Sequence, residues 1–154
     1  MKRRDLLVDG YLIDRLTGVT QPRLHPPVPR EITLIHAAPW EGTGSGYHSV
    51  FQDGNRYCMY YKAWHLDVGQ GKLNTGRHTS FCCYAESADG VTWRKPARGL
   101  YEIQGSKDNN ITLVSGMMGT LNVDAGHPAI FKDDNPNAPV DAKYKAIFRS
   151  SNSN

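Results

Sequence analysis

The stretch that decides the fold is residues 47–61, YHSVFQDGNRYCMYY, because its pattern returns later in the chain. The second copy begins at residues 127–134, HPAIFKDD, and continues after a loop at residues 143–148, KYKAIF. Each copy has a short apolar strand, an Asp-rich turn and a second strand rich in aromatic and β-branched residues. Internal repetition of a sheet unit is typical of β-propellers and related arrays. Propellers bind ligands where their innermost strands converge, so the repeat also indicates where a site would lie.

The spacing of the two copies sets the size of the repeated unit. Phe51 and Phe131 hold equivalent positions, which gives a period of 80 residues, enough for four strands and their loops. A closed propeller needs about four blades or more of four strands each, and 154 residues supply fewer than two. No amphipathic helix pattern is visible. We therefore predict an all-β partial propeller, about two blades of antiparallel sheet, whose open strand edges favour self-association.

The chain is expected to form one incomplete propeller domain, residues 1–154, in three parts. Residues 1–38 would hold an amino-terminal strand or hairpin at Leu6–Asp14 and a surface strap, because four prolines within residues 21–30 prevent regular structure. Residues 39–104 would form the first blade, and residues 105–154 the start of the second.

Local signals place further elements within these parts. The Asp53–Asn55 turn between two alternating runs predicts a hairpin. Residues 80–86 read as another strand, and short strands are expected at residues 31–36 and 99–103. Residues 65–78 are polar and rich in glycine without periodicity, so we expect a long loop there.

The composition argues against several classes of partner. The net charge of +3 comes from scattered basic residues without a dense tract, so nucleic-acid binding is not expected. No apolar run is long enough to cross a membrane. The basic start, MKRRDLLV, lacks the apolar segment of a secretory signal, and the default expectation is therefore the cytoplasm.

The three cysteines, Cys58, Cys82 and Cys83, lack the paired spacing of a zinc site. We expect buried free thiols on neighbouring strands, because reduced cysteine packs as a small hydrophobic residue. The alternative is a disulfide between Cys58 and Cys82.

Five segments of the chain resemble bacterial proteins of the five-bladed β-propeller glycosidase superfamily, which contains glycoside hydrolase families 43 and 32. They are DGYLID (residues 9–14), YCMYY (57–61), YAESADGVTW (84–93), GSKDNNI (105–111) and KYKAI (143–147). The resemblance is to members labelled as similar to the family 32 amino-terminal domain. It spans Leu6–Phe148 and matches the first third to half of a full-length member, as an amino-terminal fragment would.

The resemblance implies a partial five-bladed propeller that hydrolyses a glycosidic bond in an oligo- or polysaccharide, with a carbohydrate as partner. A non-catalytic carbohydrate-binding propeller is the alternative. The turn from Ser87 to Trp93 matches turns that are structural in such proteins, where Ser and Asp side chains bond the backbone and the Trp packs between sheets. We expect a structural role for Glu86 as well.

The family's chemistry depends on carboxylates near the axis, one as general acid and another as base or nucleophile. Two of the expected Asp positions, at the innermost strand starts, hold Tyr47 and His127 here. An enzyme would then use Asp124 or Glu41 as base or nucleophile, with His48 and His127 orienting groups or transferring protons. The family's general-acid Glu would lie beyond Asn154.

Aromatic residues near the strand starts complete the candidate site. Trp40, Tyr47 and Trp64 would stack on a sugar, in an enzyme or in a binding protein. A purely structural role for the histidines and tyrosines, as hydrogen-bonded strand ends, is the third interpretation. No cofactor or metal is expected, because the histidines have no ligand spacing. An axial calcium ion, present in some propeller glycosidases, is the one ion that the resemblance leaves open.

Overall fold

The computed structural model describes residues 10–18 and 23–151. The chain divides into two units, one up to Glu31 and one from Ile32. The described part of the first unit contains no strand. At its start Ile13 N–H donates to the Gly10 carbonyl, 3.1 Å, which closes a turn. The strand or hairpin expected at Leu6–Asp14 is therefore wrong for residues 10–14, because the apolar residues there belong to the turn. Residues 6–9 lie outside the described residues.

The predicted absence of regular structure is confirmed for residues 23–30. Proline lacks a backbone donor and fixes its own φ, so this stretch cannot join a ladder. Within the described ranges no helix is long and apolar enough to span a membrane.

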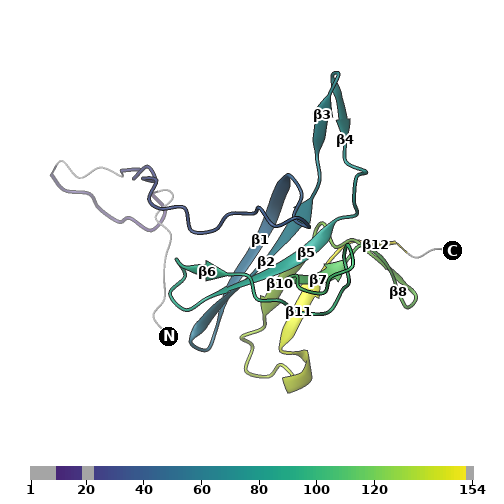
Figure 1. Ribbon diagram of the computed structural model, residues 1–154. Coiled ribbons are helices and arrows are strands. Elements are labelled where there is room, and N and C mark those ends of the chain that lie inside the picture. The colour runs from purple at the N-terminus through teal and green to yellow at the C-terminus, as the bar shows by residue number, and fades with distance from the viewer. Residues whose placement is uncertain (1–9, 19–22, 152–154) are drawn as a thin grey trace. The chain divides into compact units, whose positions relative to one another are not determined.

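The second unit is built around one antiparallel sheet (Figure 1), in the order β1 (Gly44–Asp53), β2 (Arg56–Trp64), β5 (Phe81–Ser87) and β6 (Trp93–Arg94). β7 (Ile111–Val114) also pairs with β5, at the end that β6 leaves free. The predicted hairpin of β1 and β2 and the predicted third strand are confirmed. The all-β class is confirmed as well, because the only helical element among the described residues is a short 3₁₀ turn, η1 (Val140–Ala142).

The second copy of the pattern also forms a hairpin, as predicted. β10 (Ala129–Lys132) pairs with β11 (Tyr144–Ile147) in antiparallel register. This hairpin packs beside β1, because Lys132 Nζ lies 3.1 Å from an Asp53 carboxylate oxygen and the Tyr144 hydroxyl donates to the other oxygen at 3.0 Å. The two copies of the repeated pattern are therefore neighbours in space.

Three expectations about loops and short strands are wrong, and one sheet was not expected. Residues 65–78 are not a structureless loop, because β3 (Asp67–Gly69) and β4 (Lys72–Asn74) form a small hairpin there. No strand forms at residues 31–36, where the Ile35 carbonyl accepts a hydrogen bond from Lys95 instead. None forms at residues 99–103, which end in a tight turn. A third sheet, not foreseen, contains β8 (Gly116–Met118), β9 (Leu121–Val123) and β12 (Ser150–Ser151).

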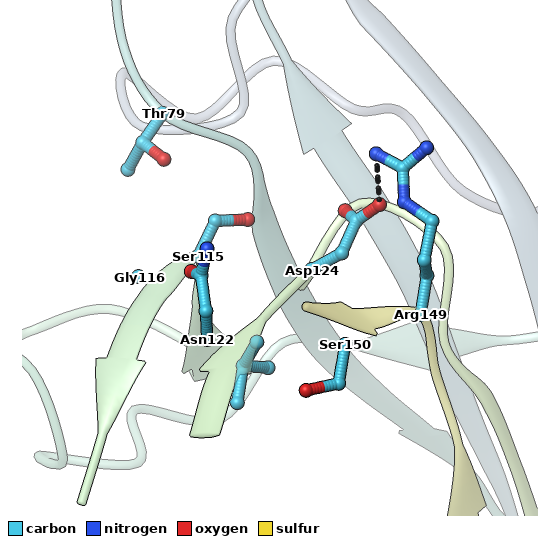
Figure 2. Close-up of a pocket in the computed structure, with 8 residues that line it drawn as sticks. Thr79, Ser115, Gly116, Asn122, Asp124, Arg149 and Ser150 are labelled. Atoms are coloured by element: carbon cyan, nitrogen blue, oxygen red, sulfur yellow. Dashed lines mark ion pairs between the residues drawn. The ribbon is translucent and has the colours of Figure 1, made fainter. Parts of the chain in front are cut away.

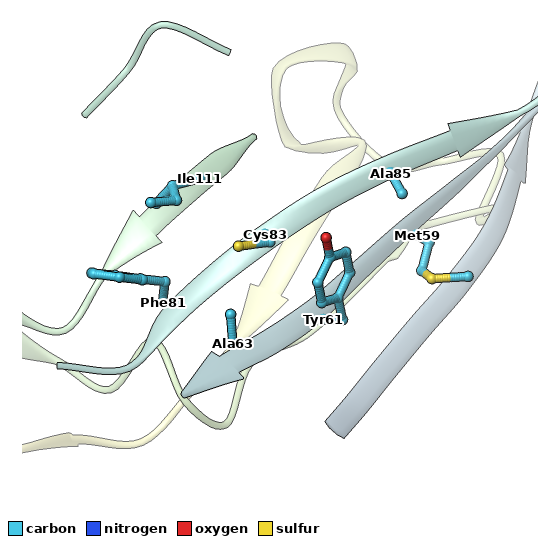
Figure 3. Packing of buried hydrophobic residues seen from close by; sticks show 7 residues of the cluster. All are labelled: Met59, Tyr61, Ala63, Phe81, Cys83, Ala85 and Ile111. Atoms are coloured by element: carbon cyan, nitrogen blue, oxygen red, sulfur yellow. The ribbon is translucent and has the colours of Figure 1, made fainter. Parts of the chain in front are cut away.

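The core lies on one face of β2 and β5 (Figure 3). Alternate residues of both strands point into it, because successive side chains of a strand face opposite ways. The buried apolar cluster consists of Met59, Tyr61, Ala63, Phe81, Cys83, Ala85 and Ile111. β5 is buried along its whole length, because it has paired strands on both of its edges.

The cysteines are buried and free, as predicted. Cys58 pairs with Glu86 in the β2–β5 register, whereas Cys82 pairs with Lys62. The two thiols therefore lie four positions apart along the ladder, so the alternative disulfide does not form.

The structural interpretation of the Ser87–Trp93 turn is confirmed. One oxygen of Asp89 accepts the backbone N–H groups of Val91 and Thr92, at 2.8 and 2.7 Å, and also the Ser87 hydroxyl, at 2.8 Å. The Trp93 indole donates to the carbonyl of Gly90 and packs against the core. Glu86, beside the turn, is buried and pairs with two arginines and a tyrosine hydroxyl.

Candidate functional site

A β-bulge in β1 sets the geometry of the site. The register with β2 shifts between Gly46 and Ser49, so that Tyr47 and His48 both lie opposite one residue, Tyr61. Tyr47 adopts a left-handed conformation with φ of 52°, which is uncommon for a bulky residue. The bulge sends the two side chains to different neighbours. The His48 ring stacks on Tyr61, 5.7 Å between centroids, while Tyr47 lies near Lys62 and His127.

The first group of candidate residues gathers around Asp124. One oxygen of Asp124 lies 2.7 Å from Nδ1 of His127 and 3.0 Å from the Arg149 guanidinium. The His127 ring meets the Tyr47 ring edge to face, 4.8 Å between centroids. The ammonium of Lys62 is next to these rings, 5.7 Å from the centre of the Tyr47 ring and 4.4 Å from the centre of the Trp64 ring. We call these residues the Asp124 cluster: Asp124, His127, Arg149, Tyr47, Lys62 and Trp64.

Asp124 is held by the backbone as well as by side chains. It directly follows β9, and its N–H donates to the carbonyl of Arg149 at 3.1 Å. Its second carboxylate oxygen accepts the N–H of Gly126 at 2.9 Å. Burial would raise the pKa of Asp124, but the hydrogen bonds from His127 and Gly126, with the charge of Arg149, outweigh it and hold the pKa below its usual value. Asp124 is therefore a fixed, ionised carboxylate.

Asp124 and Arg149 also line a pocket of about 530 Å³ (Figure 2). Its remaining lining comes from small and polar residues: Thr79, Ser115, Gly116, Asn122, Val123 and Ser150. The Asp124 carboxylate is turned toward the Arg149 guanidinium at the side of this pocket. The pocket thus offers an acceptor and a donor beside several small polar groups.

The second group of candidate residues gathers around Glu41, which is 1% exposed. One carboxylate oxygen accepts the Tyr61 hydroxyl at 2.5 Å. The other accepts Nζ of Lys95 at 2.7 Å and the N–H of Ala38 at 2.8 Å. Burial would raise the pKa of Glu41, but the nearby His36, whose Nδ1 lies 3.6 Å from the carboxylate, and these hydrogen bonds prevail and lower the pKa to about 2.

This Glu41 cluster extends in two directions. The Tyr61 hydroxyl also accepts Nδ2 of Asn110 at 2.8 Å, and the Trp40 indole donates to Oδ1 of Asn110 at 2.7 Å. On the other side Nε2 of His36 lies 3.2 Å from Nε2 of His48. Burial and the neighbouring His36 lower the pKa of His48. The cluster comprises Glu41, Tyr61, Lys95, Asn110, Trp40, His36 and His48.

The seven candidates from the sequence are therefore divided between two places. Asp124, His127, Tyr47 and Trp64 share one cluster. Glu41, His48 and Trp40 share the other. The clusters contact opposite faces of β2, since Tyr61 belongs to one, Lys62 to the other, and consecutive strand residues face opposite ways.

Sequence reasoning missed Lys62 and Arg149. Lys62 carries a visible signal, because it is the one charge within the otherwise uncharged run YCMYYKAW, residues 57–64. Arg149 carries no comparable signal, since its role depends on the pairing of β12 with β9, which places it beside Asp124.

The Asp124 cluster combines an ionised carboxylate, an imidazole, two cations and two aromatic rings, a set suited to a polar ligand with both donors and acceptors. Among the described residues, no three His, Cys, Asp or Glu side chains converge as metal ligands would. Searches of protein-family models, curated proteins and solved structures found no match to this chain.

Proposed function

We propose that this chain is part of a carbohydrate-active β-propeller and binds a carbohydrate at the Asp124 cluster. The contact between the Tyr47 and His127 rings, 4.8 Å apart, carries the proposal. These two residues hold equivalent positions in the two sequence copies, Tyr47 at the bulge of β1 and His127 just before β10. The contact between their rings supports a ligand site to which both copies contribute residues.

The strand arrangement supports the propeller part of the proposal. The order β1-β2-β5-β6 resembles that of a four-stranded antiparallel blade, with β7 as an additional strand paired to β5. The first strand of the second copy, β10, packs beside β1, since Ile130 N–H approaches Oγ of Ser49 at 3.4 Å. Neighbouring blades would place their innermost strands in this way. The described sheets do not close on themselves.

The groups in the cluster match the chemistry of a sugar. Asp124 accepts hydrogen bonds and Arg149 donates them, as sugar hydroxyls require. Tyr47 is 61% exposed, so its ring offers an apolar face to the C–H groups of a pyranose. A few placed polar groups beside aromatic surface are typical of small-molecule sites.

Hydrolysis of a glycosidic bond is the second candidate function, and the Asp124–His127 pair favours it. The ionised Asp124 could act as base or nucleophile. Because His127 directs Nδ1 to Asp124, its Nε2 points away from that carboxylate, and an imidazole can donate a proton near neutral pH. Glu41 is unsuited to either role, because it is buried and fully engaged by its own cluster.

The test has two parts. Binding of a panel of oligosaccharides to the chain is measured by isothermal titration calorimetry, and hydrolysis is measured as the release of reducing sugar from the same panel. Asp124→Asn should weaken binding about tenfold, through loss of charged hydrogen bonds. Asp108→Asn, at an exposed position away from the cluster, is the matched control. Absence of sugar release would refute the catalytic role, and saturable binding that Asp124→Asn leaves unchanged would refute the Asp124 cluster as the binding site. Failure of the whole panel to bind would refute the proposal itself.

A further inference from the structure

Lys62 is an unusual residue for the middle of a strand. It lies between Gly46 on β1 and Cys82 on β5, and it is only 8% exposed. Its ammonium is 4.4 Å from the centre of the Trp64 ring and 5.7 Å from that of Tyr47. Lysine is almost never this deeply buried unless it is paired.

The part of the chain that the structure describes supplies no anion for this cation. No described carboxylate lies within 4.0 Å of Lys62 Nζ. Asp124, the carboxylate of the same cluster, is engaged with His127 and Arg149 instead. Burial covers mainly the stem of Lys62, since its ammonium is not among the fully buried, unpartnered side-chain atoms of the described residues.

The surroundings of Lys62 leave space for a ligand. Cross-strand partners share a face of the sheet, so Gly46 stands beside Lys62 on that face without a side chain. A Cβ added at Gly46 would meet no atom within 4 Å, so the position opens onto free space. The other cross-strand neighbour, Cys82, is small.

We propose that Lys62 binds an anionic group of the carbohydrate, either the carboxylate of a uronic acid or a sulfate ester. This inference rests on the proposed function and narrows it to acidic sugars. The anion would pair with the ammonium, which no described carboxylate reaches, and the exposed Tyr47 ring would contact the sugar that carries the anion. A neutral sugar would leave the ammonium unpaired.

The experiment compares four oligosaccharide probes of equal length: oligogalacturonate, its methyl ester, a sulfated galactan and the unsulfated galactan. We expect the acidic member of at least one pair to bind about tenfold more tightly than its neutral counterpart, the gain from one charged hydrogen bond. A preference within the first pair alone identifies a carboxylate, and one within the second pair alone identifies a sulfate ester.

Lys62→Met should abolish this preference, so that acidic and neutral probes bind this variant about equally. Lys62→Arg should retain most of the preference, and Lys72→Met, at an exposed lysine on β4, should leave it unchanged. Lys62→Met should also melt close to the wild type, because methionine keeps most of the apolar stem that the neighbouring residues cover.

Equal binding of acidic and neutral probes, or an acidic preference that survives Lys62→Met, would overturn the role of Lys62 and leave the proposed function intact. Failure of all four probes to bind would overturn both. A large loss of stability in Lys62→Met would also count against an unpaired Lys62.

Discussion

Replacing Glu41 by glutamine tests the electrostatics of the buried cluster. The substitution keeps the shape of the side chain but removes its charge. It leaves the ammonium of Lys95, now 2.7 Å from Glu41, without a counter-charge in a largely buried position. It also replaces the carboxylate oxygen that accepts the Tyr61 hydroxyl.

The size of the effect follows from the pKa. The cluster lowers the pKa of Glu41 from 4.5 to about 2, and about 1.36 kcal/mol per pKa unit converts this to about 3 kcal/mol of folding free energy at neutral pH. Removal of one partner from a buried ion pair costs about 3–5 kcal/mol in other proteins. The two approaches agree in magnitude.

The sign of the pH dependence is also fixed. Because the pKa of Glu41 is lower in the folded chain, its stabilisation is complete above pH 4.5 and is lost as the pH falls toward 2. Glu41→Gln lacks this contribution. The difference in the free energy of unfolding between wild type and variant should therefore be about 2 kcal/mol smaller at pH 3 than at pH 7.

The assay is urea unfolding followed by tryptophan fluorescence at both pH values. Glu102→Gln, at an exposed glutamate, is the control and should change the free energy of unfolding by less than about 0.5 kcal/mol. The reasoning would be refuted if wild type and variant differed by less than about 1 kcal/mol in free energy of unfolding at pH 7, or if their difference were equally large at pH 7 and pH 3.

Three further predictions concern other parts of the second unit. Gly42→Ala should destabilise the chain by more than Gly54→Ala in urea unfolding, because both glycines have positive φ but only a Cβ at Gly42 would collide with the Trp64 carbonyl; equal losses would contradict this. Cys82 and Cys83 are buried, and burial raises the pKa of Cys82 to about 11 and that of Cys83 further, so iodoacetamide at pH 8 should label both only after unfolding; rapid labelling of the native chain would show that the core opens. β11 is exposed along its length, so sedimentation velocity should show a concentration-dependent species heavier than the monomer, and a monomer at all concentrations would count against association through strand edges.

Local signals in the sequence were enough to predict the main strands. The alternation on both sides of Asp53–Asn55 and the turn from Ser87 to Trp93 depend on neighbouring residues alone, and both predictions are confirmed. The β3–β4 hairpin was missed because its strands have three residues each and show no apolar alternation.

The site was harder to predict, because its geometry depends on distant contacts. The sequence indicated that Tyr47 and His48 are candidates, but which cluster each of them joins depends on the bulge. The burial of Glu41 depends on Tyr61 and Lys95, which lie 20 and 54 residues further along the chain. No pattern in the residues around Glu41 predicts contacts with residues so far along the chain.

The bulge in β1 also has a consequence for how this chain can change over evolution. A bulge absorbs one residue without altering which way the flanking residues face. Gain or loss of a residue at Tyr47 or His48 would therefore leave the ladder from Ser49 to Asp53 in register with β2. The bulge of β1 is thus a point where an insertion or deletion leaves the pairing of the following residues unchanged.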